Sequence, residues 1–201
     1  MAQSKLWTAL PDWVIYPVGI IPAVDLLWRG VENRLGADPM KVLEHGLGEW
    51  ALRFLILGLA ITPLMRFARI NLVKYRRAVG LTAFLYVVLH LAVYLMLDQQ
   101  FDWLAIGKDI VKRPYITIGM AAFVMLIPLA ITSNSLSIRK LGAAGWRKLH
   151  KLVYPAALFG AVHYLLLVKA WPPEPVIYLA IIAGLLAIRL VRPARRRARA
   201  A

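Results

Sequence analysis

Residues Val79–Leu97 read VGLTAFLYVVLHLAVYLML, a run without a single Asp, Glu, Lys or Arg. A helix of this length extends through roughly 28 Å at about 1.5 Å per residue, which is close to the roughly 30 Å of hydrocarbon in a bilayer. Arg76 and Arg77 precede the run and Asp98 follows it. The stretch therefore predicts a membrane-spanning helix.

Five further apolar blocks resemble this one, and they are Trp13–Trp28, Leu47–Met65, Tyr115–Thr132, Leu152–Val168 and Val176–Leu190. The whole chain is 61% hydrophobic with a mean hydropathy of +0.65, whereas soluble domains contain roughly 45–50% apolar residues. We therefore expect an all-α fold, a polytopic membrane helix bundle of about six transmembrane helices that forms a single domain over residues 1–201.

The charges between the blocks alternate along the chain. The side that holds both termini carries 17 of the 25 basic residues and one of the ten acidic residues, and the other side carries the rest. By the positive-inside rule the basic side is cytoplasmic, so both termini are predicted there. Residues 192–201 form a basic cytoplasmic tail, which we interpret as a topology signal and a contact with membrane lipid. No nucleic-acid partner is expected.

The sequence also excludes several kinds of chemistry. There are no cysteines, so disulfides, iron–sulfur clusters, thiolate zinc sites and covalent c-type haem are excluded. No glycine-rich phosphate loop or Rossmann fingerprint is present, and the stretches between the blocks are short. Nicotinamide chemistry is therefore expected on another polypeptide.

Two histidines lie deep within apolar blocks. His90 is 13 residues beyond Arg77, and His163 is 12 residues beyond Lys151, so both are expected about 18–20 Å from the cytoplasmic boundary. Imidazoles at one depth on two helices can ligate one haem iron. The alternative is a pair of unrelated histidines, each hydrogen-bonded inside the bundle. Zinc and di-iron are disfavoured because we expect no carboxylate at this depth.

His150 lies at the cytoplasmic end of the same block as His163, and its role is open. A spacing of 13 residues suits one haem in each half of the membrane, yet the opposing positions are Arg76 and Arg77. His150 is therefore expected to ligate an inner haem without a second histidine, with Arg77 nearby as a cofactor contact, or to meet a propionate, a quinone or a flavin.

The outer end of Leu47–Met65 offers a further candidate. Glu49 and Arg53 are four residues apart and suit an ion pair within one helix, while Arg53 alternatively meets a haem propionate. His45, just before this block, is expected at the surface.

These residues resemble the MsrQ/YedZ family, the haem-binding membrane subunits of a bacterial methionine sulfoxide reductase system within the ferric-reductase-like transmembrane group. The resemblance extends over nearly the whole chain, and its most specific part is the run GWRKLHKLVY at residues 145–154. Weaker matches are Tyr75-Arg76-Arg77 with Gly80, then His90, and Thr132-Ser133-Asn134. The resemblance implies a multi-pass protein of the bacterial inner membrane with one or two b-type haems and, by family association, FMN.

The resemblance also implies an electron path. A cytoplasmic flavin reductase or the quinone pool donates electrons, and a periplasmic molybdopterin-containing methionine sulfoxide reductase subunit accepts them and carries the substrate chemistry. In related ferric reductases two histidines lie on each of two helices, and this chain matches three of the four. The alternative functions are a stand-alone ferric or quinone reductase with the same haem site and a transporter or scaffold without a cofactor.

Overall fold

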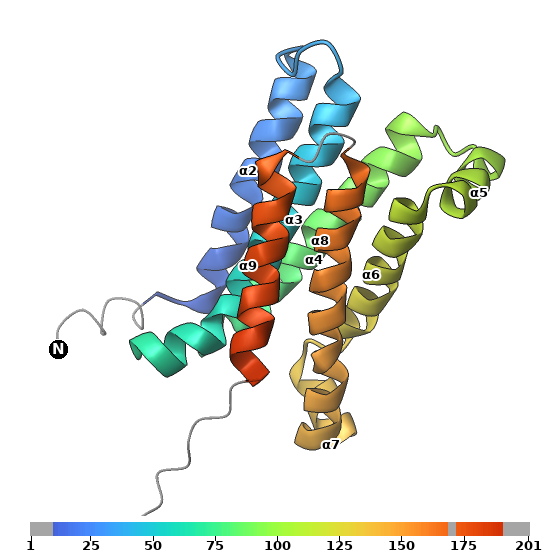
Figure 1. Cartoon of the computed structure of the whole chain (residues 1–201). Coiled ribbons are helices and arrows are strands. Elements are labelled where there is room, and N and C mark those ends of the chain that lie inside the picture. The colour runs from blue at the N-terminus through green and yellow to red at the C-terminus, as the bar shows by residue number, and fades with distance from the viewer. Residues whose placement is uncertain (1–9, 169–171, 191–201) are drawn as a thin grey trace, which may run out of the picture.

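The computed structural model describes residues 10–168 and 172–190, and every regular element within these ranges is helical (Figure 1). The long helices are α2 (Ile15–Val31), α3 (Pro39–Pro63), α4 (Arg76–Val93), α6 (Pro114–Ile131), α8 (Val153–Leu167) and α9 (Pro173–Leu190). They correspond to the six apolar blocks, so the all-α prediction is confirmed. The basic tail at 192–201 lies outside the described residues.

Four segments are long and apolar enough to cross a membrane, by length and composition. They are Asp12–Val31, Pro39–Ala68, Val73–Asp98 and Pro114–Ile131. Helix α8 has only 15 residues, and neither it nor α9 is among these four. Many large apolar side chains on the long helices point outward, such as Trp28 at 61% and Ile21 at 60% exposure, as expected for surfaces that face lipid.

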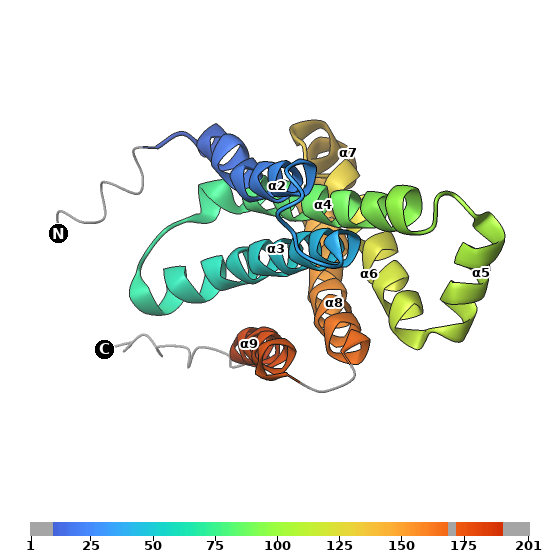
Figure 2. The same ribbon diagram turned by 90° about the horizontal axis from the view of Figure 1, so that it is seen from above.

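Helix α3 lies at the centre of the bundle. In the view from above, α2 lies on one side of it and α9 on the other (Figure 2), and α4 packs along its length. Helix α6 packs along α8 in the same way. Ala156, Ala157 and Ala161 of α8 are completely buried, because small side chains allow membrane helices to approach closely.

Tyr86 of α4 connects that helix to α2. Its ring is completely buried, and its hydroxyl donates to the carbonyl of Gly19 at 2.7 Å and accepts from the amide of Ala23 at 2.9 Å. An undistorted helix would pair these two backbone groups directly. A side chain inserted between the hydrogen-bonding groups of a helix is a known cause of bending, and Pro22 lies in the same turn. The hydroxyl of Tyr86 thus provides hydrogen-bond partners for the carbonyl of Gly19 and the amide of Ala23.

Two helices lie where the sequence predicted connections. Helix α5 (Trp103–Lys112) begins at Asp102, whose carboxylate accepts from the amides of Leu104 and Ala105. Helix α7 (Ser135–Leu149) begins at Asn134, whose side chain accepts from the amide of Ser137 at 2.8 Å. These are ordinary N-caps. Helix α7 breaks at Gly142, where φ is 68°, a conformation that glycine adopts without strain.

Short irregular helical turns complete the described chain. They are η1 (Asp12–Val14), η2 (Leu64–Ala68), η3 (Val73–Tyr75), η4 (Tyr94–Asp98) and η5 (His150–Leu152). The turn η5 leads directly into α8, so His150 and His163 share one nearly continuous helical path. The ends of α3 and α9 and the beginnings of α4 and α8 lie at the basic end of the bundle, because these segments adjoin the Arg- and Lys-rich connections.

Candidate metal centre

A cavity of about 340 Å³ lies among α3, α4, α6 and α8. Its walls are mostly apolar and include Leu52, Val87 and Phe123, while His90 and His163 line it from α4 and α8. Volumes of roughly 300–1,000 Å³ with a few convergent polar groups are typical of small-molecule and cofactor sites. The arrangement therefore has the size and lining of a cofactor pocket.

The structure brings the two buried histidines together. The ring centres of His90 and His163 are 6.1 Å apart, and the ring planes are inclined at 79°. A bond of about 2 Å from each imidazole nitrogen to a shared metal, added to the distance from each nitrogen to its ring centre, requires a separation of about 6 Å. The spacing therefore matches two imidazoles on opposite sides of one metal ion.

The hydrogen bonds of the two rings are equivalent. Nδ1 of His90 lies 2.9 Å from the carbonyl oxygen of Glu44, and Nδ1 of His163 lies 2.7 Å from that of Tyr115. A carbonyl oxygen only accepts, so each Nδ1 carries the hydrogen and donates it. Each Nε2 is left with its lone pair, which is the tautomer that a metal ligand requires.

Two glycines make these hydrogen bonds sterically feasible. Gly48 and Gly119 lie four residues after Glu44 and Tyr115, and residues four apart lie above one another on a helix. A Cβ atom would approach Nδ1 of His90 to 3.2 Å at Gly48 and Nδ1 of His163 to 2.8 Å at Gly119. Each glycine therefore lets an imidazole reach the helix backbone closely enough to bind a carbonyl.

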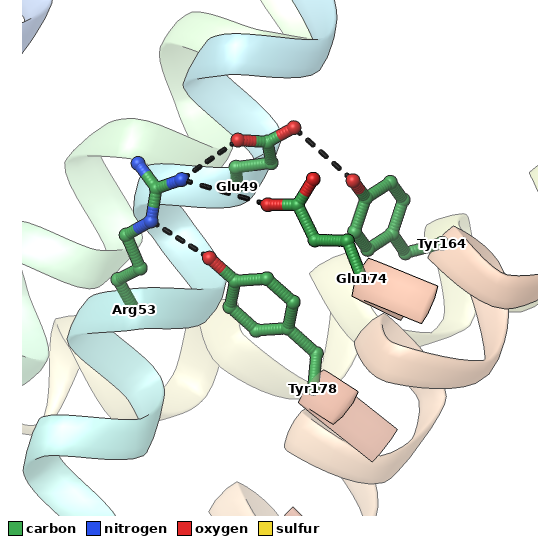
Figure 3. Close-up of polar contacts among 5 residues, drawn as sticks. All are labelled: Glu49, Arg53, Tyr164, Glu174 and Tyr178. Carbon is green, nitrogen blue, oxygen red and sulfur yellow. Dashed lines mark hydrogen bonds and ion pairs between the residues drawn. The ribbon is translucent and has the colours of Figure 1, made fainter. Parts of the chain in front are cut away.

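Arg53 lies near the middle of α3, in a cluster of polar side chains that includes Glu49, Tyr164, Glu174 and Tyr178 (Figure 3). It pairs with Glu49 at 2.8 Å, which confirms the predicted ion pair, and its Nε donates to the hydroxyl of Tyr178 at 2.7 Å. Glu174 lies 3.9 Å away, and Tyr164 donates to the other carboxylate oxygen of Glu49 at 3.1 Å. Glu49 and Tyr164 line the cavity, whereas Arg53 is not among the lining residues.

The carboxylates near the two histidines differ from the expectation. Glu44 and Glu49 both line the cavity, so the prediction that no carboxylate accompanies the histidines at their depth is wrong. Glu44 reaches the cavity because α3 begins at Pro39, eight residues before the apolar block that the sequence indicated, whereas Glu49 lies inside that block. In the described residues, however, no group of three or more His, Asp or Glu side chains is arranged to hold a metal ion.

Comparisons with known proteins agree with this architecture. A family model described as the ferric reductase like transmembrane component matches residues 47–161. The heme-binding subunit MsrQ of protein-methionine-sulfoxide reductase from Brucella anthropi is 54% identical over 181 residues, which cover 90% of this chain and 82% of that protein. The proteins of the same name from Brucella ovis and Brucella canis are each 55% identical over the same shares. The chain belongs to the MsrQ family.

This membership agrees with the resemblance found in the sequence and shows that the chain is a membrane protein of the ferric-reductase-like group. The segment matched by the group's model includes most of α3, all of α4 and α6, and α8 as far as Ala161. It therefore covers α4 and α6 completely and residues 47–63 of α3, and it ends two residues before His163 in α8.

His150 lies outside the cavity of this MsrQ family member. Its ring stacks on Trp146 with centres 3.8 Å apart, and its Nε2 lies 3.0 Å from the hydroxyl oxygen of Thr132. That hydroxyl donates to the carbonyl of Pro128 at 2.6 Å, so Nε2 of His150 is the donor to Thr132. Burial lowers the pKa of His150, and the nearby positive charge of Arg76 lowers it further. Nε2 of this ring is already engaged in the contact with Thr132.

Arg77 lies in the first turn of α4 with an exposed side chain, and it is not among the residues that line the cavity. The structure thus brings His90 and His163 together and leaves His150, Arg77 and Arg53 outside the space between them. His45 was expected at the surface, but it lies within α3, is partly buried and lines the cavity.

Sequence reasoning missed Gly48 and Gly119 as contacts of the histidines. The sequence does contain a signal for Gly48. A glycine inside a helix lowers helix stability, so its presence indicates close packing at that position. Gly119 carries the same signal inside the block Tyr115–Thr132, but only the tertiary structure places His163 beside it.

Proposed function

We propose that this chain is the haem-binding membrane subunit of a protein-methionine-sulfoxide reductase system and that His90 and His163 are the axial ligands of a b-type haem. The observation that carries the proposal is the pair of imidazoles 6.1 Å apart, each with Nδ1 bound to a backbone carbonyl. The curated MsrQ relatives, which share more than half of their aligned residues with it, carry the name heme-binding subunit.

The donor set favours haem over other metals. Zinc and di-iron sites take three or more protein ligands, whereas a porphyrin supplies four nitrogens and leaves only two axial positions. The cavity offers two neutral imidazoles, and the described residues provide no larger ligand group. Its apolar walls suit the face of a porphyrin. Haem iron, when bound, supplies a one-electron redox couple whose potential depends on its axial ligands and their hydrogen bonds.

The residues of the chain then have distinct tasks. Glu44 and Tyr115 fix the tautomer and orientation of the two imidazoles through their carbonyl oxygens. Leu52, Val87 and Phe123 give the cavity an apolar lining. No side chain needs to act as a general acid or base, because the substrate chemistry belongs to a partner subunit.

The position of the site suggests the direction of electron flow. His90 is 14 residues beyond Arg76 on α4, or about 21 Å along the axis, so the site lies far from the basic end. With six spans and both termini in the cytoplasm, the site falls in the outer half of the membrane. We propose that a cytoplasmic flavin reductase or the quinone pool donates electrons and that a periplasmic molybdopterin-containing methionine sulfoxide reductase accepts them.

One haem in the cavity accounts for His90 and His163. A second haem at His150 would use Nδ1 of that ring or displace Thr132 from Nε2, with a second ligand that is not histidine or with none. We assign His150 the role of a relay or ligand on the cytoplasmic side. FMN, which the family resemblance implies, is assigned to the basic end on grounds of charge alone.

The test is the reduced-minus-oxidised spectrum of purified variants, with haem counted by pyridine haemochrome. His90→Ala and His163→Ala are each expected to lose the low-spin b-type signal. His150→Ala should keep the full low-spin signal if the cavity holds the only haem, and it should lose half of that signal if there are two haems. A full low-spin signal in either of the first two variants would remove the proposed ligand pair.

A second measurement separates this function from that of a stand-alone ferric or quinone reductase, which the name of the matching family model favours. Adding the periplasmic reductase with methionine sulfoxide to the dithionite-reduced protein should rapidly reoxidise the haem. If the haem stays reduced with that partner but is reoxidised by ferric citrate or a quinone, the result would support a stand-alone reductase.

A further inference from the structure

The arginines that reach toward neighbouring helices differ in their partners. Near the middle of α3, Arg53 has carboxylate partners in Glu49 and Glu174 (Figure 3). At the basic end, Arg189 of α9 and Arg76 of α4 lie near each other without any carboxylate. All ten acidic side chains of the chain belong to the described residues, and none forms an ion pair with either of these arginines.

Arg189 reaches inward from α9 and is held by neutral groups. Its guanidinium donates to the hydroxyl of Tyr154 at 3.0 Å and to the carbonyl of Leu59 at 2.6 Å, and it lies over the ring of Tyr154. Its Nε is buried and has no hydrogen-bond partner in the described structure. A buried donor on a charged group is costly to leave unpaired, so this nitrogen indicates a missing acceptor.

Arg76 brings a second positive charge to the same place. Its guanidinium donates to the hydroxyl of Thr62 at 3.3 Å, and Thr62 lies three residues after Leu59 on α3. Residues three apart are neighbours on one helix face, so both guanidinium groups lie against a single turn of α3. They are close enough to repel each other electrostatically, and two like charges at a partly buried position call for an anion between them.

We propose that Arg76 and Arg189 bind the phosphate of an anionic phospholipid in the leaflet at the basic end of the bundle. Planar guanidinium groups with free N–H donors suit phosphate oxygens. Basic sites between membrane helices on the cytoplasmic side are recognised lipid headgroup sites, and Arg76 begins α4 while Arg189 is the last residue but one of α9. The exposed side of Arg76 provides access from the lipid.

The proposal is independent of the haem ligands and is tested by lipid retention. The full-length protein is purified in neutral detergent, titrated with phosphatidylglycerol or phosphatidylcholine, and the bound lipid is counted by native mass spectrometry. The wild type should retain one phosphatidylglycerol in preference to phosphatidylcholine. Arg76→Gln and Arg189→Gln should each weaken retention about fivefold, since a basic residue at an anionic surface contributes about 1 kcal/mol.

Arg139→Gln is the matched control, because Arg139 is an exposed basic residue on α7 at the same end. This variant should retain lipid as the wild type does. Arg189→Lys keeps the charge but loses the planar donor pair, so it should fall between the wild type and Arg189→Gln. An unchanged haem spectrum in each variant shows that the fold is intact. Wild-type retention in the two glutamine variants would overturn the proposal, as would displacement of the lipid by millimolar inorganic phosphate, which would identify free phosphate as the ligand.

Discussion

Replacing Gly119 by alanine should disturb the proposed haem site although the change adds only one methyl group. On propensity alone, alanine would stabilise an exposed helix by about 1 kcal/mol relative to glycine. Here, however, the new Cβ would lie 2.8 Å from Nδ1, 3.1 Å from Cε1 and 3.2 Å from Cγ of His163. The ring cannot stay in place at such distances, so the hydrogen bond from Nδ1 to the carbonyl of Tyr115 must lengthen or break.

The loss of an outer hydrogen bond to a metal-bound histidine typically weakens metal binding by about 10- to 100-fold. We therefore expect Gly119→Ala to bind haem 10- to 100-fold more weakly, or about 1.4–2.8 kcal/mol, with a shift from low-spin towards high-spin iron. The measurement is haem titration of the apoprotein followed by Soret absorbance. Gly48→Ala should show a smaller effect, because its Cβ would approach His90 only to 3.2 Å.

Gly184→Ala on α9 is the matched control, because nothing lies within 4 Å of the added Cβ. It should leave haem affinity unchanged and give a slightly more stable helix. If Gly119→Ala binds haem with wild-type affinity and an unchanged spectrum, the carbonyl of Tyr115 does not orient a ligating His163, and the reasoning from the two glycines fails.

Three further perturbations test the bundle around the site. Tyr86→Phe should lower the unfolding free energy by about 1–3 kcal/mol, because two backbone groups of α2 lose their bridging hydroxyl. The measurement is denaturation in detergent followed by tryptophan fluorescence, and no loss would mean that these two backbone groups bond each other directly in the variant. Arg53→Met should lower the unfolding free energy by a similar amount and leave the haem spectrum unchanged, since Arg53 contacts Glu49 and Tyr178 and does not line the cavity. Loss of haem in this variant would instead support a contact between Arg53 and a haem propionate. Since the chain has no cysteines, single-cysteine variants can test the topology: Phe101→Cys should react with an impermeant maleimide in intact cells and Arg139→Cys only after lysis, and the reverse pattern would refute the orientation.

The helices of the bundle could be predicted because they depend on local composition. Each apolar block was visible in the sequence, and each is a helix in the structure. The boundaries were less predictable where polar residues continue a helix. Helix α3 begins at Pro39 because Asp38 caps it, accepting from the amide of Lys41, and this extra length carries Glu44 and His45 to the cavity. Helices α5 and α7 were missed because they have only 10 and 15 residues and carry several charges, so they were read as connections between the apolar blocks.

The candidate site was also predictable only in part. Equal depth on two spans indicated His90 and His163, because depth follows from counting residues along a helix. Rotation about the helix axis does not follow from counting, and it depends on packing between helices. Packing placed His150 against Trp146 and Thr132 and turned Arg53 towards Glu49 and Tyr178.

The sequence by itself determined that this chain forms a helical membrane bundle with its positive charge at one end, because lipid requires apolar segments of a fixed length and the charges between them are read directly. It also determined that two histidines lie at one depth. Only the tertiary structure decided that their ring centres lie 6.1 Å apart, that two glycines let the rings reach backbone carbonyls, and that Arg76 and Arg189 lie near each other without a carboxylate. These features depend on which faces of separate helices come into contact, and close packing between helices far apart in sequence sets that geometry.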